Sequence, residues 1–407
     1  MLIYRIIMAL ALPFIMAVLL VRRTSFLHER LGFGPPAPAV KTLWLHGASN
    51  GELTSARKVL EAVLDGDPTV QMLVTCNTQT GRAMVQEWHL PRVTAALAPL
   101  DTGGAAGRVL RRWQPRAMVI VENELWPARI KAAHARGIPV LVIGARMSAR
   151  SARMWQKLRG VIAQTLQRVA WVSAQDTASR DRLVALGLRP QAVGPVIALK
   201  SFGAATGRPP PFTAPAARNR TVLAASTHEG DDALVLDAFI AARAAHCLDH
   251  LILAPRHPRR ARQIAALIAA RGLRFATRSK GEVPDADTPV FLADTMGEMD
   301  HWYAMAGITI IGGTFSNRGG HTPWEPASHG SAILHGPDVA NFAAPFAALD
   351  AAGGAVAVQD GAGLTQALLA TDGEKQTVVA SAARVVLAPT DGAAVLVDKI
   401  LACLSPA

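Results

Sequence analysis

Short runs of apolar residues alternate with longer helix-like stretches along most of this sequence, and the alternation is interrupted once. The runs are Thr42–His46, Met72–Cys76, Ala117–Val121, Val140–Gly144 and Ala170–Ser173 before the interruption, and Thr221–Ala225, Leu251–Ala254, Val290–Ala293 and Ile308–Ile311 after it. Continuous apolar runs between helices are typical of parallel strands that are buried on both faces. The sequence therefore predicts an α/β protein with two Rossmann-like halves.

The interruption reads GAATGRPPPFTAPAA and has the composition of an interdomain linker. We therefore expect an N-terminal Rossmann-like domain over residues 32–202, a linker over 203–217 and a C-terminal Rossmann-like domain over 218–407. A chain of 407 residues is long enough to give each domain its own core. Ligands of such sheets bind beyond the carboxyl ends of the strands, so we expect the site in a cleft between the halves.

Residues 1–23 are expected to form a membrane anchor. Ile6–Val21 is uncharged and apolar, is broken only by Pro13, and is followed directly by Arg22 and Arg23. As a helix this segment would measure roughly 24 Å, a little less than the ~30 Å of a bilayer core. A cleaved signal peptide is the alternative, but no small-residue cleavage site closes the apolar run. Arginines after the segment favour a globular body on the cytoplasmic face of the inner membrane.

The net charge of +12 calls for an anionic partner. Nucleic acid is disfavoured, because no basic patch interleaved with aromatic residues is visible. Arg146, Arg150, Arg153 and Lys157 recur at helical spacing and form either a solvated face or a basic stripe for an anionic membrane surface. The three cysteines show no metal-ligand spacing, so we expect neither a metal nor another cofactor.

Carboxylates follow two predicted strands of the first half. Glu52 closes the segment WLHGASNGE at the start of a helix, and Glu122 and Glu124 follow the strand Ala117–Val121 in VENELWP. One explanation is helix capping, since the helix dipole stabilises a carboxylate in the first turn. The other is a general base that takes a proton from an acceptor hydroxyl. Two acidic clusters at equivalent strand ends favour a site.

Three loops of the second half point to a nucleotide. The segment IIGGTFSNRGGHTPWEP ends a strand and opens a helix, whose free N–H groups would suit an anion and whose Glu325 would suit ribose hydroxyls. Arg256 and His257 follow another strand and offer a cation for phosphate. Asp294–Glu298 is a third loop that leads into a helix.

The motifs resemble, in the same order, those of the 3-deoxy-D-manno-octulosonic acid (Kdo) transferases of Gram-negative bacteria. The matching strings are LHGASNGE, VENELWP, GARMSARSA, ASTHEGDD, LAPRHP, RSKGEVP, DTMGEM, GGTFSNRGGHTPWEPASHG and HGPDVANF, and they cover nearly the whole chain. The resemblance implies an inverting, metal-independent glycosyltransferase of the GT-B type. Such an enzyme would move Kdo from CMP-Kdo onto the lipid A precursor during lipopolysaccharide biosynthesis.

The resemblance also implies roles for individual residues. Glu52 matches the general base, and Glu122 matches a residue that assists the transition state. The positions that match those holding the CMP moiety are Pro255, Arg256, Met296, Gly297, Glu298, Thr322, Pro323, Trp324 and Glu325. Two departures stand out: Asn50 replaces a residue that is usually valine, and Lys200 lies three residues beyond the family's lysine. We therefore assign Lys200 no catalytic role.

Two other functions stay open from the sequence. The first is a membrane-associated transferase of the same fold that uses another nucleotide sugar; a diphosphate donor would need more cationic contacts than Arg256 supplies. The second is a catalytically silent nucleotide-sugar-binding protein, which would have no use for both Glu52 and Glu122. In the transferase reading, we expect Arg256 and the loop around His321 to stabilise the departing phosphate in place of a metal.

Overall fold

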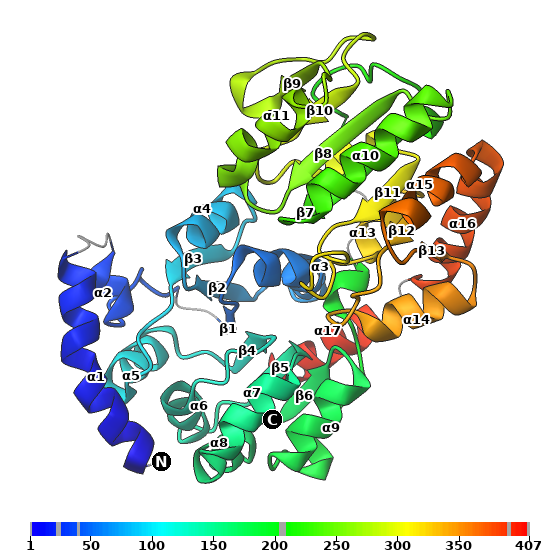
Figure 1. Cartoon of the computed structure of the whole chain (residues 1–407). Helices are drawn as coiled ribbons and strands as arrows, with labels where there is room; N and C mark the ends of the chain where they lie inside the picture. Colours follow the sequence, from blue (N-terminus) through cyan, green and yellow to red (C-terminus); the bar gives the residue numbers. More distant parts are fainter. Residues whose placement is uncertain (1, 22–25, 39–40, 203–208, 389–391, 405–407) are drawn as a thin grey trace. The chain divides into compact units, whose positions relative to one another are not determined.

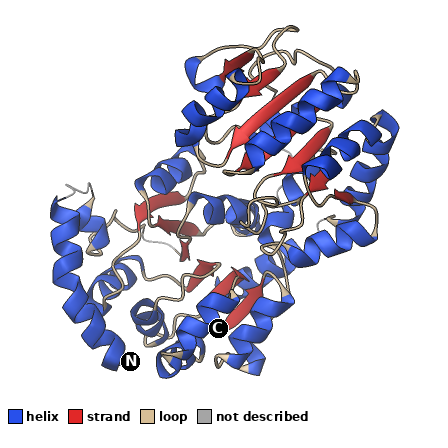
Figure 2. Ribbon diagram, in the orientation of Figure 1, coloured by secondary structure: helices blue, strands red, loops and turns tan. Residues whose placement is uncertain are grey.

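The computed structural model describes residues 2–21, 26–38, 41–202, 209–388 and 392–404 (Figure 1). The chain divides into two compact units, one made of residues 1–202 with 389–407 and the other of residues 203–388. Each unit contains one sheet of parallel strands accompanied by helices (Figure 2). Two parallel α/β sheets, as the apolar runs predict, are therefore confirmed.

The sheet of the first unit has the order β3-β2-β1-β4-β5-β6, and the described strands pair in parallel throughout. Its strands are β1 (Thr42–His46), β2 (Gln71–Cys76), β3 (Val93–Leu97), β4 (Ala117–Val121), β5 (Val140–Ala145) and β6 (Trp171–Ala174). The order of strands reverses between β1 and β4. In open parallel sheets, ligands bind beyond the carboxyl ends of the strands at such a switch point.

Alternate residues of these strands face two different cores, which is why the runs are apolar throughout. Leu43 and Leu45 of β1 pack in one core cluster, whereas Trp44 packs in the cluster on the opposite face. The helical segments of this unit are α1 (Leu2–Val21), α2 (Leu27–Arg30), α3 (Asn50–Gly66), α4 (Gln79–Glu87), α5 (Gly103–Trp113), α6 (Pro127–His134), α7 (Ala149–Gln156), α8 (Arg159–Leu166), α9 (Thr177–Ala185), α17 (Gly392–Leu404), and the 3₁₀ turns η1 (Pro190–Ala192) and η2 (Leu199–Phe202).

The sheet of the second unit has the order β13-β12-β11-β7-β8-β10-β9 and is also parallel in its described strands. Its elements are η3 (Arg218–Arg220), β7 (Thr221–Thr227), α10 (Asp231–Ala244), β8 (His250–Pro255), η4 (Pro258–Arg260), α11 (Ala261–Ala269), β9 (Phe275–Thr277), η5 (Arg278–Lys280), β10 (Val290–Leu292), α12 (Met299–Met305), β11 (Ile308–Ile311), α13 (Trp324–Ser328), β12 (Ala332–His335), α14 (Ala343–Ala351), β13 (Ala355–Ala357), α15 (Gly361–Ala370) and α16 (Gly373–Val386). Here the order reverses between β11 and β7, which again marks the place for a ligand.

The C-terminal helix α17 corrects the expected domain boundary. The sequence analysis placed it in the second half, whereas Leu396, Ile400 and Leu404 are buried in the core that α3 shares with β1. The chain therefore returns to the first unit at its end, because the apolar face of α17 covers α3 there. Strands β3, β9, β12 and β13 were not expected either; β13 and β9 are short strands at the edges of their sheet.

Parts of the expected anchor and linker lie outside the described residues, namely residues 1, 22 and 23 of the anchor and 203–208 of the linker. Residues 209–217 form no helix or strand. The anchor segment is the helix α1, and its Tyr4 hydroxyl donates a hydrogen bond to Asp101 Oδ2 at 2.6 Å. Within the described part of the chain, no helix combines the length and the apolar character that a bilayer crossing requires.

Candidate functional site

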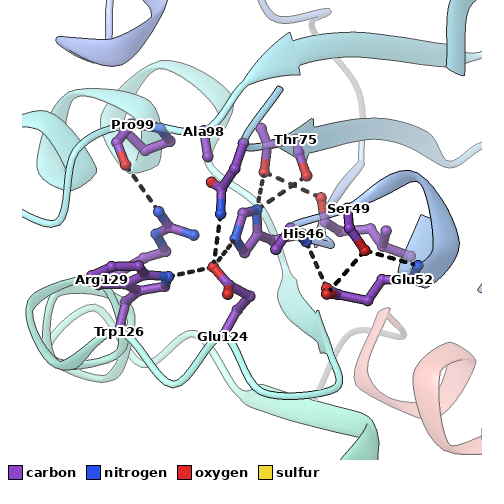
Figure 3. Close-up of polar contacts among 12 residues, drawn as sticks. His46, Ser49, Glu52, Thr75, Ala98, Pro99, Glu124, Trp126 and Arg129 are labelled. Carbon is purple, nitrogen blue, oxygen red and sulfur yellow. Dashed lines mark hydrogen bonds and ion pairs between the residues drawn. The ribbon is translucent and has the colours of Figure 1, made fainter. Parts of the chain in front are cut away.

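Glu52 lies in the first turn of α3, directly beyond the carboxyl end of β1 (Figure 3). Ser49 is the N-cap residue: its Oγ accepts the Glu52 N–H at 3.3 Å and donates to Glu52 Oε1 at 3.2 Å. Glu52 Oε2 accepts the N–H of Ala48 at 2.7 Å. The carboxylate therefore does cap the helix, as one explanation held, and this capping also fixes its position at the switch point of the sheet.

The environment of Glu52 raises its pKa to about 7. Burial is the largest cause, because it disfavours the charged form; the Ala48 hydrogen bond opposes it, and the charges of Glu122 and Glu124 add to it. A carboxylate with this proton affinity is ionised in part near neutral pH and is a stronger base than an ordinary glutamate. The site thus has the protonation behaviour that a general base requires.

Glu122 and Glu124 follow β4, the strand next to β1 in the sheet. Glu122 has a φ of 57°, a left-handed conformation that residues with a side chain adopt seldom, and its N–H bonds Ile143 O at 3.0 Å. The backbone thus turns at the end of β4, and both carboxylates come close enough to Glu52 for their charges to raise its pKa. The two acidic clusters that the sequence predicted at equivalent strand ends are indeed brought together in one place.

Glu124 is the centre of a polar network that the sequence analysis did not predict (Figure 3). Its Oε2 accepts hydrogen bonds from His46 Nε2 at 3.2 Å, from Asn77 Nδ2 at 3.1 Å and from the indole N–H of Trp126. Burial alone would raise the pKa of Glu124, but these hydrogen bonds outweigh it and lower the pKa to about 2. Glu124 is therefore a fixed negative charge.

His46 is fully buried at the end of β1, and burial lowers its pKa to about 4, so the ring is neutral. Its Nδ1 lies 3.0 Å from the hydroxyl of Thr75, which in turn accepts the indole N–H of Trp44 at 2.9 Å. Nδ1 also lies 3.0 Å from the carbonyl oxygen of Thr75. Because the ionised carboxylate of Glu124 can only accept a hydrogen bond, we assign the ring proton to Nε2, which donates to it. In the sequence, His46 could have been recognised as a site residue because it is a histidine at the end of an otherwise apolar strand.

In the second unit, His228 and His321 come together from the loops after β7 and β11, on either side of the switch point. Their Nε2 atoms lie 3.0 Å apart and their rings are nearly parallel. Buried Asp231 ties the two loops together, because its Oδ2 accepts the N–H of His228 at 2.8 Å and the N–H of Gly313 at 2.7 Å. The sequence analysis named His321 but gave His228 no role.

Arg256 and His257 follow β8, the strand beside β7. The rings of His257 and His228 stand edge to face with their centroids 5.8 Å apart. Arg256 is exposed, and no described residue pairs with its guanidinium group, while Pro255 is the buried last residue of β8. Nitrogen-bearing side chains thus gather at the switch point of this sheet, which suits a phosphate.

Several backbone N–H groups of the glycine-rich loop after β11 are already paired. The N–H groups of Gly313 and Gly319 bond Asp231 and Asp338, and those of Arg318 and Gly320 bond Gly313 O. These four groups are not free, because the loop folds back on itself. In addition, the helix that follows, α13, has only five residues and contributes little dipole. The imidazole and guanidinium groups at the same edge of the sheet offer a second set of candidate groups for an anion.

The other predicted nucleotide residues lie on the loops after β10 and β11. Met296 is 64% exposed and precedes Gly297, whose φ is 85°. Glu298 is paired with Arg278, with Nε–Oε2 and Nη2–Oε1 distances of 2.9 and 2.6 Å, and this pairing lowers its pKa. Its carboxylate therefore anchors the loop in which Met296 and Gly297 lie exposed.

Thr322 and Pro323 lead into α13, where Trp324 packs on Phe342 with their ring centroids 6.0 Å apart. Glu325 is exposed and accepts a hydrogen bond from the buried Tyr303 of α12. This bond joins α12, which follows β10, to α13, which follows β11. The predicted nucleotide residues are thus on connected loops at one edge of the second sheet.

Two further sequence predictions concern basic residues. Lys200 belongs to η2, and its side chain lies outside the described residues. The basic stripe does not lie on one helix, because α7 ends at Gln156 and α8 begins at Arg159. Arg150 and Arg153 are exposed on α7, and Lys157 is exposed just beyond it.

Comparison with known proteins agrees with the resemblance seen in the sequence motifs. The family model of 3-deoxy-D-manno-octulosonic-acid transferase (kdotransferase) matches residues 25–202. The 3-deoxy-D-manno-octulosonic acid transferase of Bordetella pertussis is 33% identical over 352 residues, which are 81% of this chain and 79% of that protein. The enzyme of the same name from Haemophilus influenzae is 29% identical over 323 residues, or 78% and 76% of the two chains.

Among solved structures, the UDP-GlcNAc 2-epimerase from Neisseria meningitidis bound to UDP-GlcNAc is similar with a TM-score of 0.61 and 14% identity. The match covers 89% of this chain and all of that one. A putative UDP-N-acetylglucosamine 2-epimerase from Listeria monocytogenes gives a TM-score of 0.62 at 11% identity, over 90% and 96% of the chains. At such identities the likeness concerns the fold alone.

Proposed function

This chain belongs to the 3-deoxy-D-manno-octulosonic acid transferase family and is a glycosyltransferase, and we propose that it transfers Kdo from CMP-Kdo to a lipid A precursor in lipopolysaccharide biosynthesis. The observation that carries the proposal is the position of Glu52. Its carboxylate lies at the switch point of the first sheet with a pKa of about 7, beside two further carboxylates. A protein that only binds a nucleotide sugar has no need of such a base.

In the proposed reaction, Glu52 takes the proton of the acceptor hydroxyl. The acceptor oxygen forms a bond to the anomeric carbon of Kdo from one side, while the bond from that carbon to the phosphate oxygen breaks on the other. The electron pair of the breaking bond leaves with CMP. Because the acceptor attacks from the side opposite to CMP, the anomeric configuration inverts. Glu122, as a second anion beside Glu52, assists the developing positive charge at the sugar ring.

We place the donor in the second unit, at the carboxyl ends of β11, β7 and β8. Arg256 and the pair of His228 and His321 would stabilise the negative charge on the departing phosphate. The proposed contacts to the rest of CMP are made by the remaining residues of this set: Pro255, Met296, Gly297, Glu298, Thr322, Pro323, Trp324 and Glu325. The proposed arrangement is the GT-B type, without a metal, and it is supported by the two parallel sheets and by the family membership.

We also propose that the protein acts at the cytoplasmic face of the inner membrane. Support comes from α1, where Ile6, Leu10 and Phe14 are spaced four residues apart and are 51%, 76% and 74% exposed. Such a stripe suits the interfacial region of a bilayer. Met154 of α7 and Leu158 just beyond it are exposed, lie near Arg150, Arg153 and Lys157 in the chain, and would add to binding at an anionic surface.

Vesicle flotation tests the membrane proposal. Replacing Ile6, Leu10 and Phe14 together by serine should release the protein from vesicles that contain anionic lipid. Replacing Val378 and Val385 by serine is the matched control, because these side chains are 62% and 78% exposed on α16 of the second unit. Equal flotation of both variants would contradict the proposal.

Donor choice tests the enzymatic proposal. Purified protein in detergent is incubated with a lipid A precursor and with CMP-Kdo, a UDP-hexose or a CMP-linked nonulosonic acid, each in the presence of EDTA. We expect product from CMP-Kdo alone, and its mass gives the number of Kdo residues added. Product from the UDP-hexose, or a loss of all product with EDTA, would overturn the proposed donor or the metal-independent mechanism.

A further inference from the structure

Glu124, in the acidic loop after β4, has surroundings that suggest a function of its own. Its Oε2 accepts N–H groups from three segments of the first unit: His46 at the end of β1, Asn77 after β2 and Trp126 before α6. The side chain of Glu124 is only 17% exposed. Three donors on one oxygen hold the carboxylate in place and keep it ionised.

A continuous chain of hydrogen bonds joins Glu124 to Glu52. The side chain of Asn77 donates to Glu124, and the backbone N–H of Asn77 donates to Ala48 O at 3.1 Å. The N–H of Ala48 then donates to Glu52 Oε2 at 2.7 Å. Asn77 and Ala48 thus fix both carboxylates relative to each other.

The other oxygen of Glu124 is free of such bonds. Oε1 accepts no hydrogen bond from a described residue, and in Figure 3 the carboxylates of Glu52 and Glu124 face the same space. A structural role alone would be met by a neutral group, since an amide oxygen accepts N–H groups as well. Hydrogen bonding alone therefore does not explain why position 124 carries a charged carboxylate near the base, with all its hydrogen bonds on one oxygen.

We propose that Glu124 is a positioning residue for the base: its fixed charge and its link through Asn77 and Ala48 set how tightly Glu52 holds a proton. This inference rests on the proposed role of Glu52. Without the charge of Glu124, Glu52 would give up its proton more readily and would be the weaker base. Glu124 therefore acts on the reaction through Glu52 and not by contact with the sugar.

Other charged residues also lie on the elements around Glu52. Glu122 raises the pKa of Glu52 together with Glu124, while buried Arg129 of α6 lies close enough to His46 to lower the pKa of that ring. The remaining charged residues on elements packed against α3 are Arg82 and Glu87 of α4, Asp398 and Lys399 of α17, and Lys200 of η2. Among these, Arg82, Glu87, Asp398 and Lys399 make no described bond to Glu52, and the side chain of Lys200 lies outside the described residues.

The test is a direct titration of the carboxylates by NMR of the full chain with ¹³C-labelled glutamate side chains, with Glu52→Gln and Glu124→Gln used for assignment. In the wild type, the Glu52 signal should titrate near pH 7 and the Glu124 signal should stay ionised from pH 4 to 8. In Glu124→Gln, the midpoint of Glu52 should fall by about one pH unit. The control Glu61→Gln, which alters an exposed pair with Arg57 on the same helix, should leave it unchanged.

An unchanged Glu52 midpoint in folded Glu124→Gln would overturn the inference. Should that variant fail to fold, the wild-type titration decides, because a Glu124 signal that titrates between pH 4 and 8 also overturns it. The titration needs no turnover, so it separates this inference from the proposed function. If Glu52→Gln keeps full transfer activity, the proposed base is wrong whatever the titration shows.

Discussion

His228 and His321 lie with their rings nearly parallel, at an interplanar angle of 4°, and with their Nε2 atoms 3.0 Å apart. One ring must donate an N–H and the other must accept it, since two doubly protonated rings would repel each other at this distance. Asp231 holds the loops of both rings through backbone N–H groups. The pair is therefore pre-arranged at the switch point of the second sheet, where a phosphate would approach.

Replacement of His228 tests this arrangement. We expect His228→Asn to weaken CMP binding about tenfold, which corresponds to the loss of one hydrogen bond to a charged group. Isothermal titration calorimetry with CMP measures the change. The control is His246→Asn, because His246 is exposed and has a φ of 55° that asparagine tolerates well. Equal affinities for both variants would remove His228 from the donor site.

Arg256 is predicted to contribute to both binding and turnover. Since its guanidinium group would face the departing phosphate, Arg256→Ala should lower kcat/KM for CMP-Kdo by about 100-fold. Arg262→Ala is the matched control, because Arg262 is an exposed arginine in the next helix, α11. Wild-type rates in Arg256→Ala would show that another group stabilises the phosphate.

The raised pKa of Glu52 predicts the pH dependence of the reaction. A general base must be ionised to accept a proton, so kcat/KM should rise with pH up to a midpoint near pH 7 and then level off. An ordinary glutamate would give a midpoint below pH 5. Initial rates between pH 5 and 9, at saturating CMP-Kdo and varied acceptor, distinguish the two. A profile already flat at pH 5 would contradict this assignment of the base.

The raised pKa of Glu52 also predicts that the fold is less stable at higher pH. Because the folded state raises the pKa of Glu52, ionisation of this group destabilises the fold, and the loss develops as pH rises from the unfolded value near 4.5 to about 7. Glu52→Gln should therefore be more stable than the wild type at pH 8 and equally stable at pH 4.5. Thermal unfolding at the two pH values measures the difference, and a variant that is destabilised at pH 8 would speak against a strained carboxylate.

The packing of α17 makes a prediction about the first unit. Ile400 is 1% exposed in the core with α3, so Ile400→Ala should lower the free energy of unfolding by about 2–5 kcal/mol. Val395→Ala on the same helix should cost less than about 1 kcal/mol, because Val395 is 43% exposed. Urea denaturation of both variants provides the comparison. Equal losses would mean that α17 adds little to this core.

The parallel sheets could be predicted because the central strands consist mainly of apolar residues. Thr42–His46 and Ala117–Val121 are strands with the bounds that their apolar runs indicate. Strand β3 was missed, since VTAAL has little apolar bulk, and the return of α17 was missed because no local pattern shows which unit a C-terminal helix covers.

The two acidic loops were predictable because they follow strands, and strand ends of a parallel sheet share one edge. The network around Glu124 could not be predicted, since His46, Asn77 and Trp126 come from three separate segments that only the fold brings together. The same holds for His228 and His321, which are 93 residues apart in sequence. In the glycine-rich loop of the second unit, the pairing of four backbone N–H groups could not be predicted, because pairing within a loop cannot be seen in a sequence.

The most direct test of the central claim compares transfer of Kdo from CMP-Kdo to a lipid A precursor by the wild type, by Glu52→Gln and by the control Glu61→Gln. Mass spectrometry of the lipid detects the product, and CMP binding shows that the variants are folded. We predict that the wild type and Glu61→Gln form product at similar rates, whereas Glu52→Gln binds CMP normally but transfers at least 100-fold more slowly. Transfer by Glu52→Gln at the wild-type rate would contradict the assignment of Glu52 as the general base.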